Sequence, residues 1–253
     1  MKKLIYNLLD FVTSGKGILI KMNGFSYKMP TRWFRYYRDG YEKETFIFIK
    51  NKIKPGNTVL DIGAHIGLYV NPFSKLVGET GKVFSFEPTV TTFRVLEKTI
   101  QLNDLQNVFP VQAAISDKKE ILTFNLTTID GEGSNANSIV QRDENPNSIK
   151  VQAFSIDTFR TENNLKIDFL KIDVEGAEAL ALRGAKETFK EDKPSGILAL
   201  HPDMIKRNGN SLEEIWDLLV QFGCAIYFEK KTITKLWFLE QVNLFDVEFD
   251  VKQ

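Results

Sequence analysis

The sequence is poor in the residues that build disulfides and most zinc sites. Its 253 residues include one cysteine, Cys224, and two histidines. A single cysteine excludes an intramolecular disulfide and a zinc site built on cysteines, and a reducing compartment such as the cytoplasm is its simplest setting. The spacing of the histidines and acids matches no specific set of ligands, so we expect no bound metal.

The formal net charge is zero as well, because 33 Lys and Arg residues balance 33 Asp and Glu residues. A nucleic-acid binder normally carries a basic excess, so we expect no nucleic-acid partner. The neutral total is the sum of two unlike parts. Residues 1–38 hold eight basic side chains against Asp10 alone and carry +7, which leaves −7 on the remainder. We expect the basic part to face an anionic acceptor or a membrane surface.

No uncharged apolar run reaches the roughly 18 residues that a membrane helix needs. The segment MKKLIYNLLDFV resembles a signal peptide, but Asn7 and Asp10 interrupt its apolar run and no small-residue cleavage site follows. Its apolar residues follow helical spacing, which predicts a short amphipathic helix. We expect this helix to pack on the domain. A foot on a membrane surface, through residues 1–38, is the alternative.

The chain does contain a regular alternation of apolar runs and helical patterns. The continuous apolar runs 59–62, 169–172 and 197–200 indicate strands that are buried on both faces, as in a parallel sheet covered by helices. This pattern predicts a doubly wound α/β fold. CAIYFEK and ITKLWFL are the last two segments of the expected pattern of strands. The expected helices lie at 42–52, 67–78, 90–103, 176–189 and 211–222.

The residues that precede this alternation predict a separate N-terminal extension. GILIKMNGFSYKM is typical of a β-hairpin that turns at Asn23-Gly24. In the segment TRWFRYYRDGY that follows, aromatic rings suit sugars and arginines suit phosphates or carboxylates, although a packed segment with solvated arginines would look the same. We therefore divide the chain into an extension, 1–41, and an α/β domain, 42–253. The polar loop 127–147, with Ser134, Asn135 and Asn137, is expected to be a lid.

A glycine turn, DIGAHIG, follows the first buried strand at residues 61–67. Gly63 and Gly67 let the backbone bend sharply and approach a ligand, and the start of the next helix favours an anion. Asp61 can accept from a ligand ammonium. An anion site beside a carboxylate suits an amino-acid zwitterion.

Glu87 ends the second strand, 20 residues after Gly67, where an acid would hold a ribose diol. A nicotinamide enzyme would show G-x-G-x-x-G, whereas this chain has D-x-G-x-x-x-G. The difference favours S-adenosylmethionine over a dinucleotide. A tight turn with an incidental surface glutamate is the purely structural alternative.

The segments VLDIGAHIG, FSFEP, AAISD and especially DFLKIDVEGAE resemble the FkbM family of S-adenosylmethionine-dependent methyltransferases, over roughly residues 42–229. The resemblance implies a class I, Rossmann-like fold with a seven-stranded, mostly parallel sheet that contains one antiparallel strand. It also implies methyl transfer, usually to a hydroxyl oxygen. Residues 42–253 would then be the methyltransferase domain.

The resemblance further implies that Asp61, Gly63 and Gly67 surround the methionine part of the cofactor and that Glu87 holds the ribose. Two positions depart from the family: His65 stands where Asn is more frequent, and Ala199 stands where the strand often carries an acid. Further cofactor contacts are predicted at neighbouring positions: Ala64, His65, Pro88, Asp117, Asp173 and Glu175.

Charged residues interrupt the apolar strand IDFLKID. Strand alternation places Lys171, Asp173 and Glu175 on one side. Charges within an apolar run are costly unless they are paired or lie at the carboxyl edge of the sheet, where α/β proteins bind ligands. Glu175 and Glu178 open the next helix, so capping is the alternative for Glu175 and the favoured interpretation for Glu178.

His201 ends the next core strand and should lie near Asp173. An alcohol acceptor must lose its proton, and a histidine or a carboxylate can take it. We predict that Asp173 or His201 is the base and that Lys171 orients the carboxylate. For the adenine, Asp117 or backbone groups must serve, because alanines follow the third strand where an acid is common.

These features predict an O-methyltransferase that uses S-adenosylmethionine and acts on a sugar hydroxyl of a glycan or glycosylated metabolite, with an anionic or lipid-linked acceptor among the options. A non-catalytic glycan- or partner-binding module on the same fold is one alternative, and an N- or RNA methyltransferase is another. The Asn/Asp-Pro-Pro-aromatic motif common in amine methylation is absent, since the matching strand end is Asp173-Val174-Glu175-Gly176.

Overall fold

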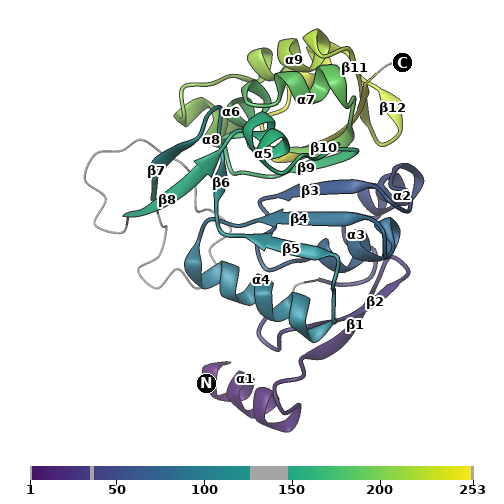
Figure 1. Ribbon diagram of the computed structural model, residues 1–253, viewed down its shortest axis with the longest axis vertical. Helices are drawn as coiled ribbons and strands as arrows, with labels where there is room; N and C mark the ends of the chain where they lie inside the picture. Colours follow the sequence, from purple (N-terminus) through teal and green to yellow (C-terminus); the bar gives the residue numbers. More distant parts are fainter. Residues whose placement is uncertain (1, 35–36, 126–147, 252–253) are drawn as a thin grey trace.

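The computed structural model describes residues 2–34, 37–125 and 148–251. Its centre is a sheet with the strand order β12-β11-β13-β10-β9-β3-β4-β5 (Figure 1). The five strands from β10 to β5 are parallel, and β13 runs antiparallel to both of its neighbours, β10 and β11. The strands are β3 (Thr58–Ile62), β4 (Lys82–Phe86), β5 (Val108–Val111), β9 (Phe169–Ile172), β10 (Ser195–Leu200), β11 (Cys224–Phe228), β12 (Lys231–Thr232) and β13 (Phe245–Val251).

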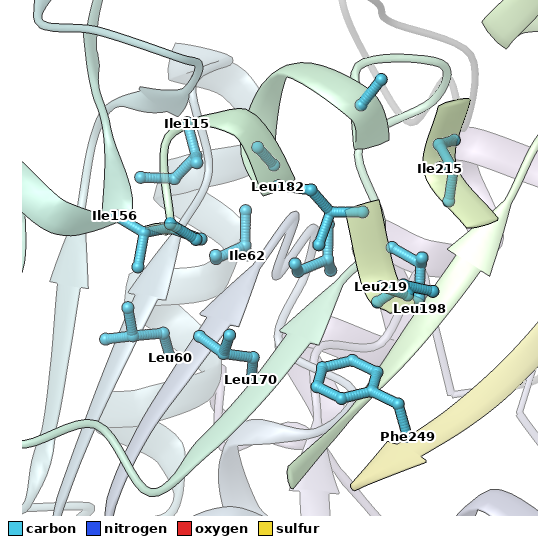
Figure 2. Packing of buried hydrophobic residues seen from close by; sticks show 14 of the residues in the cluster. Leu60, Ile62, Ile115, Ile156, Leu170, Leu182, Leu198, Ile215, Leu219 and Phe249 are labelled. Carbon is cyan, nitrogen blue, oxygen red and sulfur yellow. The ribbon is translucent and has the colours of Figure 1, made fainter. Parts of the chain in front are cut away.

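Helices cover both faces of this sheet, which confirms the expected doubly wound α/β fold. Successive residues of β3 point to opposite faces: Val59 belongs to the core cluster shared by α2, α3 and α4, and Leu60 to the cluster shared by the helices from α5 to α9. Figure 2 shows the second of these clusters, in which Leu60, Leu170 and Leu198 come from three adjacent strands. The helices are α2 (Lys43–Lys52), α3 (Val70–Val77), α4 (Val90–Leu102), α5 (Ile156–Glu162), α6 (Glu178–Arg183), α7 (Lys186–Glu191), α8 (Pro202–Arg207) and α9 (Leu212–Gln221).

Two expected helices have different limits in the structure. The helix expected over 67–78 begins at Val70, because residues 65–69 form turns. The helix expected over 176–189 is divided into α6 and α7 at Gly184. A side chain at Gly184 would meet the Ser116 carbonyl oxygen at 2.4 Å, so the backbone approaches its neighbour too closely for another residue.

The end of the sheet differs from the seven-stranded expectation. ITKLWFL forms the helix α10 (Lys235–Leu239), because the Thr234 hydroxyl accepts a hydrogen bond from the Trp237 N–H and starts a helix there. The last strand is β13, whose sequence FDVEFDV alternates apolar and acidic residues. Phe245, Val247 and Phe249 are buried on one face, as a period of two requires. The short β12 adds an eighth strand at the edge.

A second, three-stranded sheet has the order β6-β8-β7. It follows the central strand β5 and carries the chain back to α5, where the Ser155 hydroxyl caps the helix by accepting from the Thr158 N–H. The lid predicted at 127–147 lies outside the described residues. The three strands are β6 (Ala114–Ile115), β7 (Glu120–Asn125) and β8 (Ser148–Phe154).

The predicted hairpin is confirmed as β1 (Ile18–Met22) and β2 (Phe25–Met29), with Met22 paired to Phe25 across the turn. Its buried face belongs to the same core cluster as α2, α3 and α4. The Tyr27 hydroxyl also donates to the Leu68 carbonyl at 3.1 Å. The hairpin is therefore fixed to the body of the protein.

The predicted N-terminal helix is confirmed as α1 (Lys2–Val12), in which Tyr6 and Leu9 are half-buried. Leu8, Phe11 and Val12 are exposed. The hydroxyl of Thr31 donates to the Asp10 carboxylate at 2.6 Å and links the helix to the chain that follows the hairpin. Among the described residues, no helix combines the length and the apolar character needed to cross a bilayer.

The burial of β13 predicts a large effect of one of its side chains, Phe249, on stability. Phe249→Ala is expected to lower the free energy of unfolding by about 3–5 kcal/mol, because Phe249 is fully buried in the core cluster. Leu236→Ala, at a side chain that is 69% exposed, is the control and should cost under about 0.5 kcal/mol. Urea unfolding of both variants measures the difference, and equal losses would contradict the role of β13.

Candidate active site

A cavity of about 460 Å³ opens at the carboxyl edge of the sheet, where α/β folds bind their ligands. Its lining draws on the ends of β3, β4, β9 and β10, on the start of β13 and on the chain before α2. Two cationic side chains, Lys171 and His201, line it together with five acidic ones: Glu42, Glu87, Asp173, Glu175 and Asp246.

The end of β3 and the glycine turn after it are hydrogen-bonded to the ends of β4 and β9, the strands on either side. The N–H groups of Gly63 and Ala64 both donate to the Phe86 carbonyl, and the Asp173 N–H donates to the Ile62 carbonyl. Gly63 has a φ of 78°, and a Cβ there would lie 1.7 Å from the Asp173 carbonyl oxygen. Only glycine fits at position 63, where the turn passes directly against the backbone of Asp173. Because α3 begins at Val70, the expected helix N-terminus does not follow the turn directly.

A buried ammonium connects two carboxylates across β3 and β9. Lys171 Nζ lies 3.2 Å from Asp173 Oδ2 and 3.8 Å from Asp61 Oδ1. Burial lowers the pKa of Lys171, but the two carboxylates raise it above its ordinary value overall. Burial raises the pKa of Asp61 to about 6, although Lys171 opposes this shift. Lys171 thus lies where it can orient Asp173, whose side chain is 36% exposed.

Asp61 itself lies behind the cavity wall rather than in its lining. Its carboxylate is fully buried, and neither oxygen has a hydrogen-bond partner in the described part of the chain. The Asp61 carboxylate compensates the charge of Lys171 from the core side, away from the cavity. Contact with a ligand ammonium, which the sequence suggests for Asp61, stays a prediction.

His201 is held by a carboxylate that the sequence suggests chiefly as a helix cap. Glu178 Oε1 lies 2.9 Å from His201 Nδ1, and it also accepts from the Gly176 N–H. The other ring nitrogen, Nε2, faces Asp173 Oδ1 at 3.8 Å and Glu175 Oε1 at 3.9 Å. Burial lowers the pKa of His201, but Glu178 and then the other two carboxylates raise it to about 9 overall. His201 is therefore a cation at neutral pH.

Glu87 and Pro88 line the cavity at the end of β4. Glu87 is buried, and its Oε1 accepts from the Thr89 N–H at 2.9 Å. Burial raises the pKa of Glu87 to about 7, although the N–H groups of Thr89 and His65 lower it. Glu87 thus lies at the strand end where a ribose is expected.

His65 has a different environment from His201. It lines the cavity, and its ring edge meets the Trp33 ring with 5.5 Å between centroids. Burial lowers the pKa of His65 to about 4, so the ring is neutral over the ordinary pH range. Burial and two unlike sets of neighbours therefore give this protein one neutral and one charged histidine.

Some predicted residues are not brought to the cavity. Asp117 is exposed and does not line it, whereas Ala113 and Ala114 do. Gly67 lies behind the lining, where a Cβ would meet Leu96 at 2.9 Å. The aromatic segment contributes two lining residues, Tyr37 and Tyr41, while Arg35, Tyr36, Ser134, Asn135 and Asn137 lie outside the described residues.

Sequence reasoning misses two acids of the lining, Asp246 and Glu42. Asp246 pairs in register with Ala199, so β13 places a carboxylate beside the position where the resemblance suggests an acid. Burial, with Glu42 and Asp173 nearby, raises the pKa of Asp246 to about 7. Glu42 accepts from the Tyr69 hydroxyl. Recognising the alternation of FDVEFDV as a strand would have indicated Asp246, but no sequence signal marks Glu42.

The two histidines should titrate far apart. In imidazole NMR spectra, His65 is expected to lose its proton near pH 4 and His201 near pH 9. Glu178→Gln should lower the pKa of His201 towards or below its ordinary value of about 6.5, because the principal carboxylate partner is lost.

Because folding raises the pKa of His201, protonation of this ring stabilises the folded protein at low pH more than at high pH. Protonation of His201 stabilises the fold fully below the unfolded value of about 6.5, and this contribution is lost as the pH rises through about 9. The control for the NMR titration is Glu213→Gln, which removes only an exposed contact with Lys235. It should leave the titration midpoints of His65 and His201 unchanged. A His201 midpoint near 6.5 in the wild type would refute the Glu178 pairing.

Comparison with known proteins agrees with this geometry. Residues 61–225 match the Methyltransferase FkbM domain family. The chain is 27% identical over 191 residues to the 2-O-methyltransferase NoeI of Sinorhizobium fredii, an alignment that covers 70% of this chain and 76% of that protein.

Solved methyltransferase structures show the same fold. A structure named as an rRNA-methylase, from Clostridium thermocellum, aligns with a TM-score of 0.50 at 12% identity, covering 83% of this chain and 95% of that one. A methyltransferase FkbM from Methylobacillus flagellatus KT aligns with a TM-score of 0.48 at 14% identity over 77% of this chain, which spans 43% of that structure's length. The family match and the alignment with a TM-score of 0.50 together confirm the class I methyltransferase fold. Because the family match covers most of the chain, this protein belongs to the FkbM family of S-adenosylmethionine-dependent methyltransferases.

Proposed function

We propose that this protein transfers the methyl group of S-adenosylmethionine to a hydroxyl oxygen of a neutral sugar or similar polyol. One observation carries the proposal. A single cavity joins the glycine turn and Glu87, at one end, to the carboxylates and the imidazolium of β9, β10 and β13 at the other. The name of the NoeI relative, a 2-O-methyltransferase, supports oxygen as the acceptor atom.

The residues around β3 and β4 fit this cofactor, which supplies a methyl group already activated on a sulfonium. Glu87 is a buried carboxylate that makes no ion pair in the described part of the chain, and burial raises its pKa. Two ribose hydroxyls would supply the hydrogen bonds that such a group needs. Ala113 and Ala114 leave room beside it for a flat ring.

The opposite end of the cavity is left for the acceptor. Three strands separate β4 from β13, so Glu87 and Asp246 belong to strands about 19 Å apart at the usual strand spacing. A cofactor with its ribose at Glu87 leaves the β10 and β13 end accessible. Asp246, Glu42 and His201 line that end.

The charges there favour a neutral acceptor. Both cations of the lining are already paired, Lys171 with Asp61 and Asp173, and His201 with Glu178. Neither cation is therefore left to bind a phosphate or a uronic acid, and burial raises the pKa of Glu175 and Asp246 to about 7, so these carboxyl groups can be neutral near pH 7. Hydroxyl groups, in contrast, can donate to these oxygens.

Methyl transfer requires the acceptor proton to leave as the new oxygen–carbon bond forms and the sulfur–carbon bond breaks. Glu178 raises the pKa of His201 to about 9, which favours the protonated ring and makes His201 the weaker candidate for accepting this proton. We therefore assign the proton to Asp173, a partly exposed carboxylate that lies between Lys171 and His201. The two cations fix its orientation, and holding the acceptor in line supplies much of the rate.

The cofactor site can be tested by calorimetric titration with S-adenosylhomocysteine. We expect micromolar binding to the wild type, weakened about tenfold by Glu87→Gln, because hydrogen bonds to a charged group are lost. Glu79→Gln, at an exposed position on the loop before β4, is the matched control and should bind normally. Glu87→Gln is preferred to a change at Gly63, where any side chain would clash with backbone. No heat from the wild type would exclude this cofactor.

The assignment of Asp173 can be tested with a neutral methyl glycoside as acceptor and mass detection of the product. Asp173→Asn is expected to lower kcat by about 10²–10⁴-fold while affinity for S-adenosylhomocysteine changes less than about threefold. Asp203→Asn, at an exposed position in α8, is the control. An unchanged kcat in Asp173→Asn would refute the base, and faster methylation of the matching uronic acid would refute the neutral acceptor.

A further inference from the structure

The helix α1 exposes an apolar face that nothing in the described chain covers. Leu8, Phe11 and Val12 are 60%, 83% and 70% exposed. They are spaced three and four residues apart and therefore share one face of the helix. Figure 1 shows α1 at one end of the molecule, beside the hairpin and apart from the central sheet. An apolar face of this kind on a soluble domain indicates an interaction surface.

Exposed lysines lie on the same part of the molecule. The outer face of the hairpin alternates with its buried face and carries Leu19, Lys21 and Lys28, with Leu19 paired to Lys28 across the two strands. Lys16, in the turn between α1 and β1, is exposed as well. Lys16, Lys21 and Lys28 form no ion pair within residues 2–34, 37–125 and 148–251. The N-terminal part of the molecule therefore exposes apolar side chains on α1 and both apolar and cationic ones on the neighbouring hairpin, and in the described part of the chain these lysines are not ion-paired.

We infer that α1 and the outer face of the β1–β2 hairpin bind the surface of an anionic lipid bilayer. The three apolar side chains of α1 would enter the boundary between headgroups and acyl chains, and the lysines would lie against lipid phosphates. The inference goes beyond the proposed methyl transfer, because it concerns where the enzyme works and not what it methylates.

A second copy of this chain fits the same surface less well. Self-association about a two-fold axis would bring equivalent surfaces together, so the lysines of one copy would face those of the other. Like charges in such an interface cost affinity, and the surface has few acids to offset them. Asp10 is one, and it already accepts from the Thr31 hydroxyl. Anionic headgroups compensate every lysine.

The test is co-sedimentation of the full chain with vesicles of phosphatidylcholine, with and without about 30% phosphatidylglycerol. We expect binding to the anionic vesicles that weakens strongly in about 0.5 M salt, because screening shortens the range of the lysine charges. Phe11→Glu should lower the partition coefficient at least about tenfold. Lys21→Glu combined with Lys28→Glu should lower it on anionic vesicles only. Val220→Glu, at an exposed apolar position of α9, is the matched control.

Three outcomes would overturn the inference. Wild-type protein that stays in the supernatant with anionic vesicles is the first, and equal binding by wild type and Phe11→Glu is the second. The third is a dimer in light scattering that Phe11→Glu abolishes while no vesicle binding occurs. Every variant is also titrated with S-adenosylhomocysteine to show that it folds. Failure of the wild type in that titration would refute the proposed cofactor and leave the lipid result intact.

Discussion

The buried ammonium of Lys171 is the constraint on which the site depends. Asp61 and Lys171 are register partners on β3 and β9, so adjacent strands place opposite charges side by side in the buried wall of the cavity. Removing one partner of such a group leaves an uncompensated buried charge, which is strongly destabilising. The same ammonium lies 3.2 Å from Asp173, so the position of the proposed base depends on the pairing of two core strands.

A second buried charge completes this arrangement from the other side. Glu178, fully buried at the start of α6, keeps His201 protonated, and His201 faces Asp173 from β10. Asp173 therefore lies between two cations, each held from behind by a carboxylate that does not line the cavity. This layering explains why charged residues interrupt the apolar strand IDFLKID. They belong to one network that extends from the core to the cavity.

Much of the fold follows from the sequence, because strands buried on both faces are continuous apolar runs and a parallel sheet brings their carboxyl ends together. That logic also places Glu87, Asp173 and His201 at one edge. This reasoning fails near the C-terminus. The segment ITKLWFL, which is expected to be a strand, contains a helix, and FDVEFDV, in which apolar and acidic residues alternate, forms the last strand. Asp246 reaches the site because β13 inserts, antiparallel, between β10 and β11. Glu42 reaches it through tertiary packing alone, which no local pattern encodes.

The neutral total charge of the chain can now be divided by location. The carboxylate surplus lines the cavity, and exposed lysines gather on the hairpin and beside α1. The neutral acceptor that we propose would gain nothing from a basic surface, so the exposed lysines call for a different partner. The basic surface also exposes Phe11, which a purely electrostatic role would not need. A partner that is both anionic and apolar beneath its surface meets both requirements, and a lipid bilayer has that combination.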